Sequence, residues 1–326
     1  MLIRWAFGLA VPAAIAFWFC LPEPLFNDPY SLMVLDKQGQ LVGARISDDE
    51  QWRFQMDGAV PEKFALALIT YEDKRFRAHP GVDPLAMARA LYLNLRAGKT
   101  VSGGSTLTMQ LMRMARKNRD RNITQKIIES ILALRAELRY SKDEILHLYA
   151  AHAPFGGNTV GLEAASWRYF GKPPDVLSWA EAATLAVLPN SPGLIHPGRN
   201  RKTLRTKRDR LLGRMAEAGI LSNEECTLAS LEHVPDQPYR LPDHAPHFVS
   251  LVRQEHAGRV ETTLDLSLQE DVSGIVSGYH HQYAQNEVHN MAVIVTDTES
   301  GEILAYIGNT QPDGVMHEHA VDMVRA

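Results

Sequence analysis

Cysteine is scarce in this chain of 326 residues: Cys20 lies in an apolar run and Cys226 stands alone in a polar stretch. A structural disulfide is therefore not expected. A surplus of one charge is also missing, because 34 basic and 38 acidic side chains leave a net charge of −4. This balance gives no overall attraction to nucleic acid, so an anion site must be local. The composition, 45% hydrophobic, excludes collagen-like and wholly disordered chains and predicts about two folded domains.

Only one long hydrophobic run occurs, and it lies at the N-terminus. From Trp5 to Leu21 there are seventeen residues without a charge, and with residues 1–3 the run reaches the length that spans a bilayer. Arg4 near its start predicts a cytoplasmic N-terminus. A cleaved signal peptide shares this pattern, but the aromatic residues 17–19 and the lack of a small-x-small cleavage site favour a transmembrane anchor over residues 1–22. Either interpretation predicts that the rest of the chain is exported.

Three segments follow the anchor. Residues 23–54 predict a linker with a short hairpin around Lys37-Gln38-Gly39. Residues 55–230 carry helical periodicity. Residues 231–326 contain two strand-like runs, 291–297 and 302–307, which are joined by a turn at Ser300-Gly301 and predict a second hairpin.

The helical segment contains clear signals for helix ends. Asp83 followed by Pro84 is a start signal, and Gly98 is a stop signal. Ser141 and Glu144 form a capping box. Further expected features are a cap at Thr124, core-facing side chains at Ile128 and Ile131, and a helix over 178–188 that stops at Pro189.

The densest group of reactive side chains runs from Tyr71 to Asp83 and includes Glu72, Asp73, Phe76 and His79. Glu72 follows an apolar helix, and a carboxylate held partly out of water has the raised pKa that proton transfer needs. Taken alone, the group is more typical of a solvated helix end with Asp83 as a cap.

The next motif, Gly103-Gly104-Ser105-Thr106, leads to Gln110. Glycine allows close backbone approach, and Ser105 can cap a helix whose free N–H groups point toward an anion. The motif lies in a stretch with one acidic residue and nine basic ones: Arg89, Arg96, Lys99, Arg113, Arg116, Lys117, Arg119, Arg121 and Lys126. This combination suits a phosphate or pyrophosphate. An ordinary capped helix with a solvated basic face explains it equally well.

Glu129 shares a helical face with Lys126 and Ala133. A lone glutamate on a helix is usually exposed, and Lys126 can pair with it at i, i+3 spacing. In combination, however, two carboxylates, a basic stretch and an anion-type loop predict a site that transfers a sugar from a diphosphate donor. Such a transfer needs a base for the acceptor hydroxyl and cations for the leaving pyrophosphate.

A second basic run, residues 199–214, has eight basic side chains against Asp209. It could contact anionic lipid head groups or nucleic acid, and a solvated helical face explains it as well. Export of this part of the chain argues against nucleic acid as a partner.

Three motifs follow one another along the chain: Glu72-Asp-x-x-Phe76-x-x-His79-x-Gly81-x-Asp83, Gly103-Gly-Ser-Thr-Leu-Thr-x-Gln110-Leu and Lys126-x-x-Glu129. They resemble the motifs of the peptidoglycan glycosyltransferases, the N-terminal catalytic domain of class A penicillin-binding proteins. Ala153-Pro-Phe-Gly-Gly157 and Ala164-Ala-Ser-Trp167 with Tyr169 are most similar to the 1C subgroup. The resemblance covers residues 55–225, which makes a chance match very improbable.

The resemblance implies a mainly α, lysozyme-like domain over residues 55–230 that polymerises lipid II into glycan with inversion at the sugar. It makes Glu72 the general base on the acceptor 4-hydroxyl, while Glu129 assists at the donor through the pyrophosphate or a divalent ion such as Mg²⁺ or Mn²⁺. No cofactor is otherwise required. The other residues carried over bind substrate or shape the pocket: Asp73, Phe76, His79, Gly103, Gly104, Ser105, Thr106, Gln110, Arg113 and Lys126.

The implied partners are lipid II, the growing glycan strand, the inner membrane and other cell-wall synthesis proteins. The catalytic part is expected in the periplasm, on a single-pass anchor. Three departures from the family pattern could lower activity: Ala150-Ala151 in place of a common Leu-Asn, Gln125 in place of a frequent arginine, and Lys207 in place of an arginine before Arg208.

Residues 260–326 resemble the opening of the family's penicillin-binding transpeptidase domain, through Glu261-Thr-Thr-Leu-Asp265 and Leu268-Gln269. Residues 231–326 are therefore expected to form a linker and a truncated, incomplete α+β start of that domain. Transpeptidase chemistry needs a Ser-x-x-Lys nucleophile, and the sequence has none. We expect no transpeptidase activity and no covalent penicillin binding.

Two other functions remain open from the sequence. A lysozyme-like hydrolase would act on finished glycan, although an uncharged leaving group does not need the basic residues. An inactive membrane-bound scaffold that binds lipid II or cell-wall partners would fit the alanines at 150–151.

Overall fold

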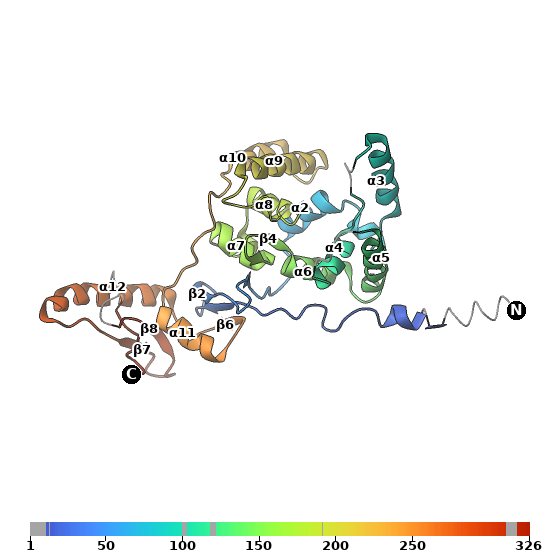
Figure 1. Ribbon diagram of the computed structural model, residues 1–326. Helices are drawn as coiled ribbons and strands as arrows, with labels where there is room; N and C mark the ends of the chain where they lie inside the picture. Colours follow the sequence, from blue (N-terminus) through green and yellow to red (C-terminus); the bar gives the residue numbers. More distant parts are fainter. Residues whose placement is uncertain (1–10, 13, 100–102, 118–121, 191, 311–317) are drawn as a thin grey trace. The chain divides into compact units, whose positions relative to one another are not determined.

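The computed structural model describes residues 11–326 except 13, 100–102, 118–121, 191 and 311–317. The chain forms two compact units (Figure 1). The first contains residues 1–28 and 56–238, and the second contains residues 29–55 and 239–326. The boundaries that the sequence suggests, at 54/55 and 230/231, remain predictions.

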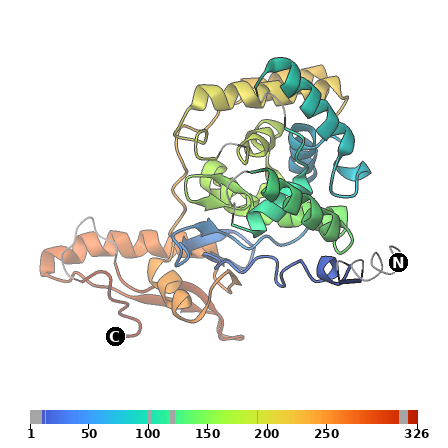
Figure 2. The ribbon, with the colours of Figure 1, turned by 45° about the vertical axis from the view of Figure 1, so that its right-hand side comes forward.

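The first unit is almost entirely helical (Figures 1 and 2). Its elements are α2 (Glu62–Glu72), α3 (Pro84–Ala97), α4 (Leu107–Ala115), α5 (Ile123–Glu137), α6 (Lys142–His152), β4 (Pro154–Gly156), β5 (Thr159–Val160), α7 (Leu162–Phe170), α8 (Trp179–Val187), α9 (Arg201–Glu217) and α10 (Asn223–Leu231). Short 3₁₀ turns cover Phe76–Ala78 and Pro174–Val176. The antiparallel pair β4 and β5 was not predicted within this helical segment.

Helix α8 explains how the first unit is packed. Ala180 and every residue from Ala182 to Val187 are buried, and a helix that is apolar on all sides belongs in a core. Helices α2, α7 and α9 pack against it, while α4 packs against α5 and α6. The end of α2 and the start of α4 are thereby held in a fixed framework.

Several predicted helix ends are confirmed. Asp83 caps α3 by accepting from the backbone N–H of Ala86, and Gly98 ends the helix in the left-handed conformation at φ 63°. The capping box at Ser141 is present, and Ser178 forms another at the start of α8.

Three local predictions were wrong. Asn122 rather than Thr124 caps α5, and Thr106 rather than Ser105 caps α4. Ile131 is exposed rather than core-facing, whereas Ile128 packs against the core. The buried face of α5 was therefore predicted only in part. The face that is buried is the one that packs against α4, and not all of the isoleucines lie on it.

The N-terminal prediction cannot be followed through the structure. Residues 1–10 and 13 of the expected anchor lie outside the described residues. Among the helices of the described part, none is long and apolar enough to cross a membrane.

The second unit combines two small sheets with two helices. Its elements are β1 (Leu32–Leu35), β2 (Leu41–Arg45), β3 (Trp52–Arg53), α11 (Pro246–Glu255), β6 (Arg259–Glu261), α12 (Leu266–Tyr283), a 3₁₀ turn at Ala284–Asn286, β7 (Val293–Thr296) and β8 (Ile303–Ile307). Both predicted hairpins are confirmed, as β1–β2 and β7–β8.

Strand β1 joins the two ends of the second unit. It lies between β2 and β6, antiparallel to the first and parallel to the second, so that Met33 faces both Ala44 and Arg259. Strand β1, which precedes helices α2 to α10 in the chain, therefore pairs with a strand that follows them.

Candidate active site

Glu72 is the last residue of α2. Its Oε2 accepts a hydrogen bond from Nε2 of Gln110 on α4, at 2.8 Å. The Gln110 Oε1 in turn accepts from the hydroxyl of Tyr149 on α6, at 3.2 Å. Gln110 and Tyr149 are both buried, so side chains from α4 and α6 hold the carboxylate at the end of α2.

Burial raises the pKa of the Glu72 carboxyl above its usual value. The Gln110 hydrogen bond, the Asn190 side chain and the positive charges of Arg113 and Lys207 oppose this rise in pKa, but less strongly. The outcome is a carboxylate that holds a proton more readily than one in water, as a general base requires.

Two hollows meet at Glu72, of about 520 and 790 Å³. Tyr71, Glu72, Gly103 and Ser105 line both of them. The smaller hollow adds the basic side chains Lys74, Arg75, Arg89 and Arg214. The larger adds Gln110, Arg113, Gln125, Lys126, Glu129 and Asn190.

The larger hollow brings together the residues predicted at the donor side. Glu129 is buried rather than exposed in the way of an ordinary helix glutamate, and it shares this lining with Glu72, Arg113 and Lys126. Two carboxylates and two cations thus face one cavity, which is the composition suited to an anionic leaving group and a proton acceptor.

Asp73 and His79 form a buried hydrogen-bonded pair. The Gly81 backbone N–H donates to Nδ1 of His79 at 3.2 Å, so the ring proton lies on Nε2, which donates to the Asp73 carboxylate at 3.0 Å. Asp73 also accepts from the Leu107 backbone N–H at 3.0 Å. The pair fastens the end of α2 to the start of α4.

Phe76 and His79 are absent from the described linings of both hollows, whereas Asp73 lines the smaller one. Phe76 is fully buried in the core, with the Lys142 ammonium 4.5 Å from its ring centre. The burial of Phe76 and His79 favours a role in positioning the site over direct contact with substrate.

The glycine-rich motif lies at the mouth of the smaller hollow. A Cβ on Gly104 would lie 2.8 Å from the Met87 Cα, so only glycine fits this approach to α3. Thr106 accepts from the Met109 backbone N–H at 3.1 Å and donates to the Gly81 carbonyl at 2.5 Å. Gly103 and Ser105 line both hollows.

Sequence reasoning missed Tyr149, Lys207 and Asn190 as neighbours of Glu72. Burial lowers the pKa of the Lys207 ammonium, and the nearby negative charge of Glu72 opposes this. Tyr149 adjoins the departure at Ala150-Ala151 and Lys207 is itself a departure from the family pattern, but their proximity to Glu72 arises only from tertiary packing.

The departures at 150–151 and 125 do not disrupt the fold around the site. Ala150 and Ala151 are buried within α6, which continues to His152. Gln125 lines the larger hollow, and its side-chain oxygen accepts from Arg116 at 2.7 Å. Gln125 therefore keeps a basic side chain close although it is itself uncharged.

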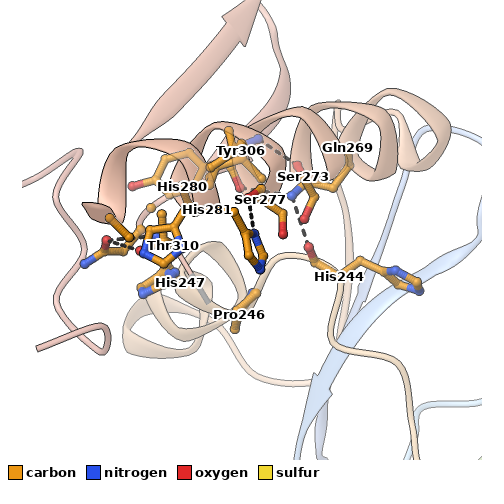
Figure 3. A pocket seen from close by; sticks show the side chains of 15 residues that line it. His244, Pro246, His247, Gln269, Ser273, Ser277, His280, His281, Tyr306 and Thr310 are labelled. Atoms are coloured by element: carbon orange, nitrogen blue, oxygen red, sulfur yellow. Dashed lines mark hydrogen bonds between the residues drawn. The ribbon is translucent and has the colours of Figure 1, made fainter. Parts of the chain in front are cut away.

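A third hollow, of about 460 Å³, lies in the second unit (Figure 3). His244, His247, His280 and His281 line it. The buried Gln269 amide closes one end: it donates to the carbonyls of His244 and Tyr306 and accepts from the Tyr306 N–H. In the described residues no group of three or more histidine, cysteine, aspartate or glutamate side chains is placed to hold a metal ion.

Comparison with known proteins identifies relatives of this chain by sequence. The chain is 34% identical to penicillin-binding protein 1C of Escherichia coli over 94% of its own length and 40% of that protein. It is 33% identical to penicillin-binding protein 1A of Aquifex aeolicus over 76% of its length and 36% of that protein. The crystal structure of penicillin-binding protein 1A from Haemophilus influenzae matches 84% of this chain and 33% of that one, with 20% identity and a TM-score of 0.35.

The chain thus spans 40% or less of the length of these two curated relatives. The sequence model of the Transglycosylase family matches residues 38–216, more than half of the chain. This match includes Glu72, Glu129 and the glycine-rich motif. The chain therefore belongs to the transglycosylase family.

Proposed function

We propose that the chain is a peptidoglycan glycosyltransferase, which joins lipid II into β-1,4-linked glycan strands with inversion at the sugar and release of undecaprenyl diphosphate. Membership of the transglycosylase family supports this proposal. The observation that carries it is the shared lining of the larger hollow, where Glu72, Glu129, Arg113 and Lys126 meet.

In this reaction Glu72 accepts the proton of the acceptor 4-hydroxyl as its oxygen forms a bond to the donor C1. The bond from C1 to the diphosphate breaks, and the electron pair leaves with the diphosphate. Attack on the face opposite the leaving group inverts the configuration. The raised pKa of Glu72 supports its role as the base.

Arg113 and Lys126 stabilise the negative charge that develops on the diphosphate. Gln110 and Glu129 orient the donor, and the backbone of Gly103 to Thr106 shapes the space between the two hollows. Asp73, Phe76 and His79 hold this framework in place. The hollow lined by Lys74, Arg89 and Arg214 is proposed for the other lipid-linked substrate, which also carries negative charge.

The unit that contains α2 to α10 is proposed to be a lysozyme-like catalytic domain over residues 55–230. Residues 231–326 are proposed to be a linker and the opening of a transpeptidase domain. Because Ser-x-x-Lys is absent from the sequence, we expect this chain to form no covalent adduct with penicillin.

We further propose that residues 1–22 anchor the chain in the inner membrane, with the catalytic domain in the periplasm and in reach of other cell-wall synthesis proteins. Exposed apolar side chains on α5 support contact with lipid: Ile123, Ile127, Ile131, Leu134 and the following Leu138. Lipid is the environment in which such a row of exposed side chains is stable.

Incubation with labelled lipid II tests the function. We expect long glycan from the natural sequence and about a hundredfold less or lower from Glu72→Gln, because the base is removed. Glu62→Gln, at the exposed start of the same helix, is the matched control and should polymerise normally. Shortening of preformed glycan would indicate a hydrolase, and binding of lipid II without product would indicate a scaffold.

A further inference from the structure

The Gln110 side-chain amide connects two helices in a definite direction. A carboxylate can only accept hydrogen bonds, so the Gln110 NH₂ group must face ionised Glu72, and its oxygen must face Tyr149. The Tyr149 hydroxyl then has to act as the donor. Its pKa is well above the ordinary value, because it is buried and lies near the negative charge of Glu72, so it keeps its proton.

The two oxygens of Glu72 are not equivalent. Oε2 accepts from Gln110, whereas Oε1 is buried, and the Asn190 side chain also favours the charged form of the carboxylate. The hydrogen bond from Gln110 therefore holds one edge of the carboxylate in place. The charged or titratable groups that influence this carboxylate or line the larger hollow with it are Tyr71, Arg113, Lys126, Glu129, Tyr149 and Lys207. The smaller hollow adds Asp73, Lys74, Arg75, Asp83, Arg89 and Arg214.

We propose that Tyr149 is a positioning residue for the glycosyltransferase reaction: it fixes the Gln110 amide, which in turn holds the Glu72 carboxylate that receives the acceptor's proton. This inference rests on the proposed function. The proton of the acceptor hydroxyl passes to the Glu72 carboxylate, the new C1–O bond forms, and the bonding pair of the old C1–O bond leaves with the diphosphate. Glu72 later returns its proton to solvent.

The test is the pH dependence of kcat/KM for lipid II in Tyr149→Phe. Without the hydroxyl, the Gln110 amide is free to turn, and ionised Glu72 loses part of its support. The midpoint of the acidic limb should move upward by roughly one pH unit, and activity should recover at higher pH. A loss that is equal at every pH, with an unchanged midpoint, would overturn the proposal.

Tyr169→Phe is the matched control. Tyr169 is also buried, and its hydroxyl donates to the carbonyls of Phe155 and Gly156, at 3.2 and 3.0 Å. It is absent from the described linings of both hollows, so the midpoint should stay at the wild-type value. An equal shift in both variants would also contradict the proposal.

Two further measurements keep the inference testable on its own. Carbon NMR titration of the Glu72 carboxyl in the full chain needs no turnover, so a shift in Tyr149→Phe would support the hydrogen-bond relay even if lipid II polymerisation failed. If Tyr149→Phe does not fold, Gln110→Met replaces it, and it should raise the Glu72 midpoint in the same direction. An unshifted Glu72 in a folded Gln110→Met variant would refute the relay.

Discussion

At the scale of single residues, Glu72 is partly buried although the proposed reaction needs it in its charged form. Its carboxylate is partly withdrawn from water, which destabilises the charged form, yet the proposed reaction needs that form as the base. The side-chain amides of Gln110 and Asn190 and the positive charges of Arg113 and Lys207 provide limited compensation. A buried group held in this way is expected to lower stability in exchange for reactivity.

Replacement of Glu72 by glutamine should therefore stabilise the protein at neutral pH. The folded-state pKa is raised above the unfolded value near 4.5, so wild-type stability falls as the pH rises from that value through the folded-state pKa. Glutamine does not titrate. Thermal unfolding of Glu72→Gln should show a Tm higher by a few degrees at pH 7 to 8.

The difference in Tm should disappear as the pH falls below 4.5, where the carboxyl is protonated in both states. Glu62→Gln serves as the control and should follow the wild type at every pH, because Glu62 is exposed. The Tm difference between Glu72→Gln and wild type should be larger at pH 7 than at pH 4. A smaller or negative difference at pH 7 would contradict the argument that burial of the charge destabilises the protein.

The sequence allowed part of this site to be predicted. Glu72 and Glu129 lie in motifs with distinctive neighbours, and the basic stretch between 89 and 126 indicated an anion partner. Tyr149 and Lys207 could not be placed in this way, since 39 residues separate Tyr149 from Gln110 in the chain. No local period or spacing connects such pairs; only the packing of α4, α6 and α9 does.

At the scale of elements, the start of α4 determines where Gln110 points. Thr106 caps the helix and also donates to the Gly81 carbonyl, which ties the cap to the preceding loop. Ser105 has the same capping chemistry but lines the hollows instead. Choosing between two adjacent residues that can both cap a helix requires the tertiary contact, which is why the sequence placed this cap one residue too early.

Thr106→Ala should lower the free energy of unfolding by about 1–2 kcal/mol, since it removes the cap and the bond to Gly81. Ser105→Ala should lower it by a few tenths at most, within the range usual for surface changes. Urea denaturation followed by circular dichroism measures both. Equal effects of the two substitutions would show that the second bond of Thr106 contributes nothing.

Helix α5 has an exposed apolar face, and its buried face was predicted only in part from the sequence. Ile127 and Ile131 have the spacing of a buried face, yet both are exposed, and Glu129 between them is buried. Periodicity identifies an apolar stripe but not the partner that covers it. For this helix we propose lipid as that partner.

The double variant Ile127→Glu and Ile131→Glu should lose activity on lipid II in vesicles by roughly tenfold or more, because the apolar contact is replaced by charge. In detergent solution its activity should be close to normal. Leu228→Glu with Leu231→Glu, two exposed leucines on α10, is the control and should show no difference between the two conditions. Equal losses in vesicles and detergent would argue against lipid contact by α5.

At the scale of the whole molecule, the chain passes between the two units in the exposed segment around residues 236–240. Limited trypsin treatment should cut after Arg240. The two fragments should remain together under native conditions, because β1 on one fragment pairs with β6 on the other and Arg45 forms an ion pair with Asp243 at 3.0 Å.

Gel filtration followed by denaturing electrophoresis checks this expectation. Both bands should appear in a single native peak, and Arg240→Gln should remove the cut. Separate elution of the fragments would mean that the shared sheet does not hold the second unit together.

The position of β1 between β2 and β6 also has a consequence for biosynthesis. The ribosome delivers β1 and β2 first and reaches β6 more than 200 residues later, a delay of about ten seconds or longer at common translation rates. During this interval the β1 edge has no neighbour on one side and is open to mispairing with other nascent chains. The helical unit can become compact in the meantime, so the pairing of β6 with β1 is expected to follow the folding of the helices that lie between them in the chain.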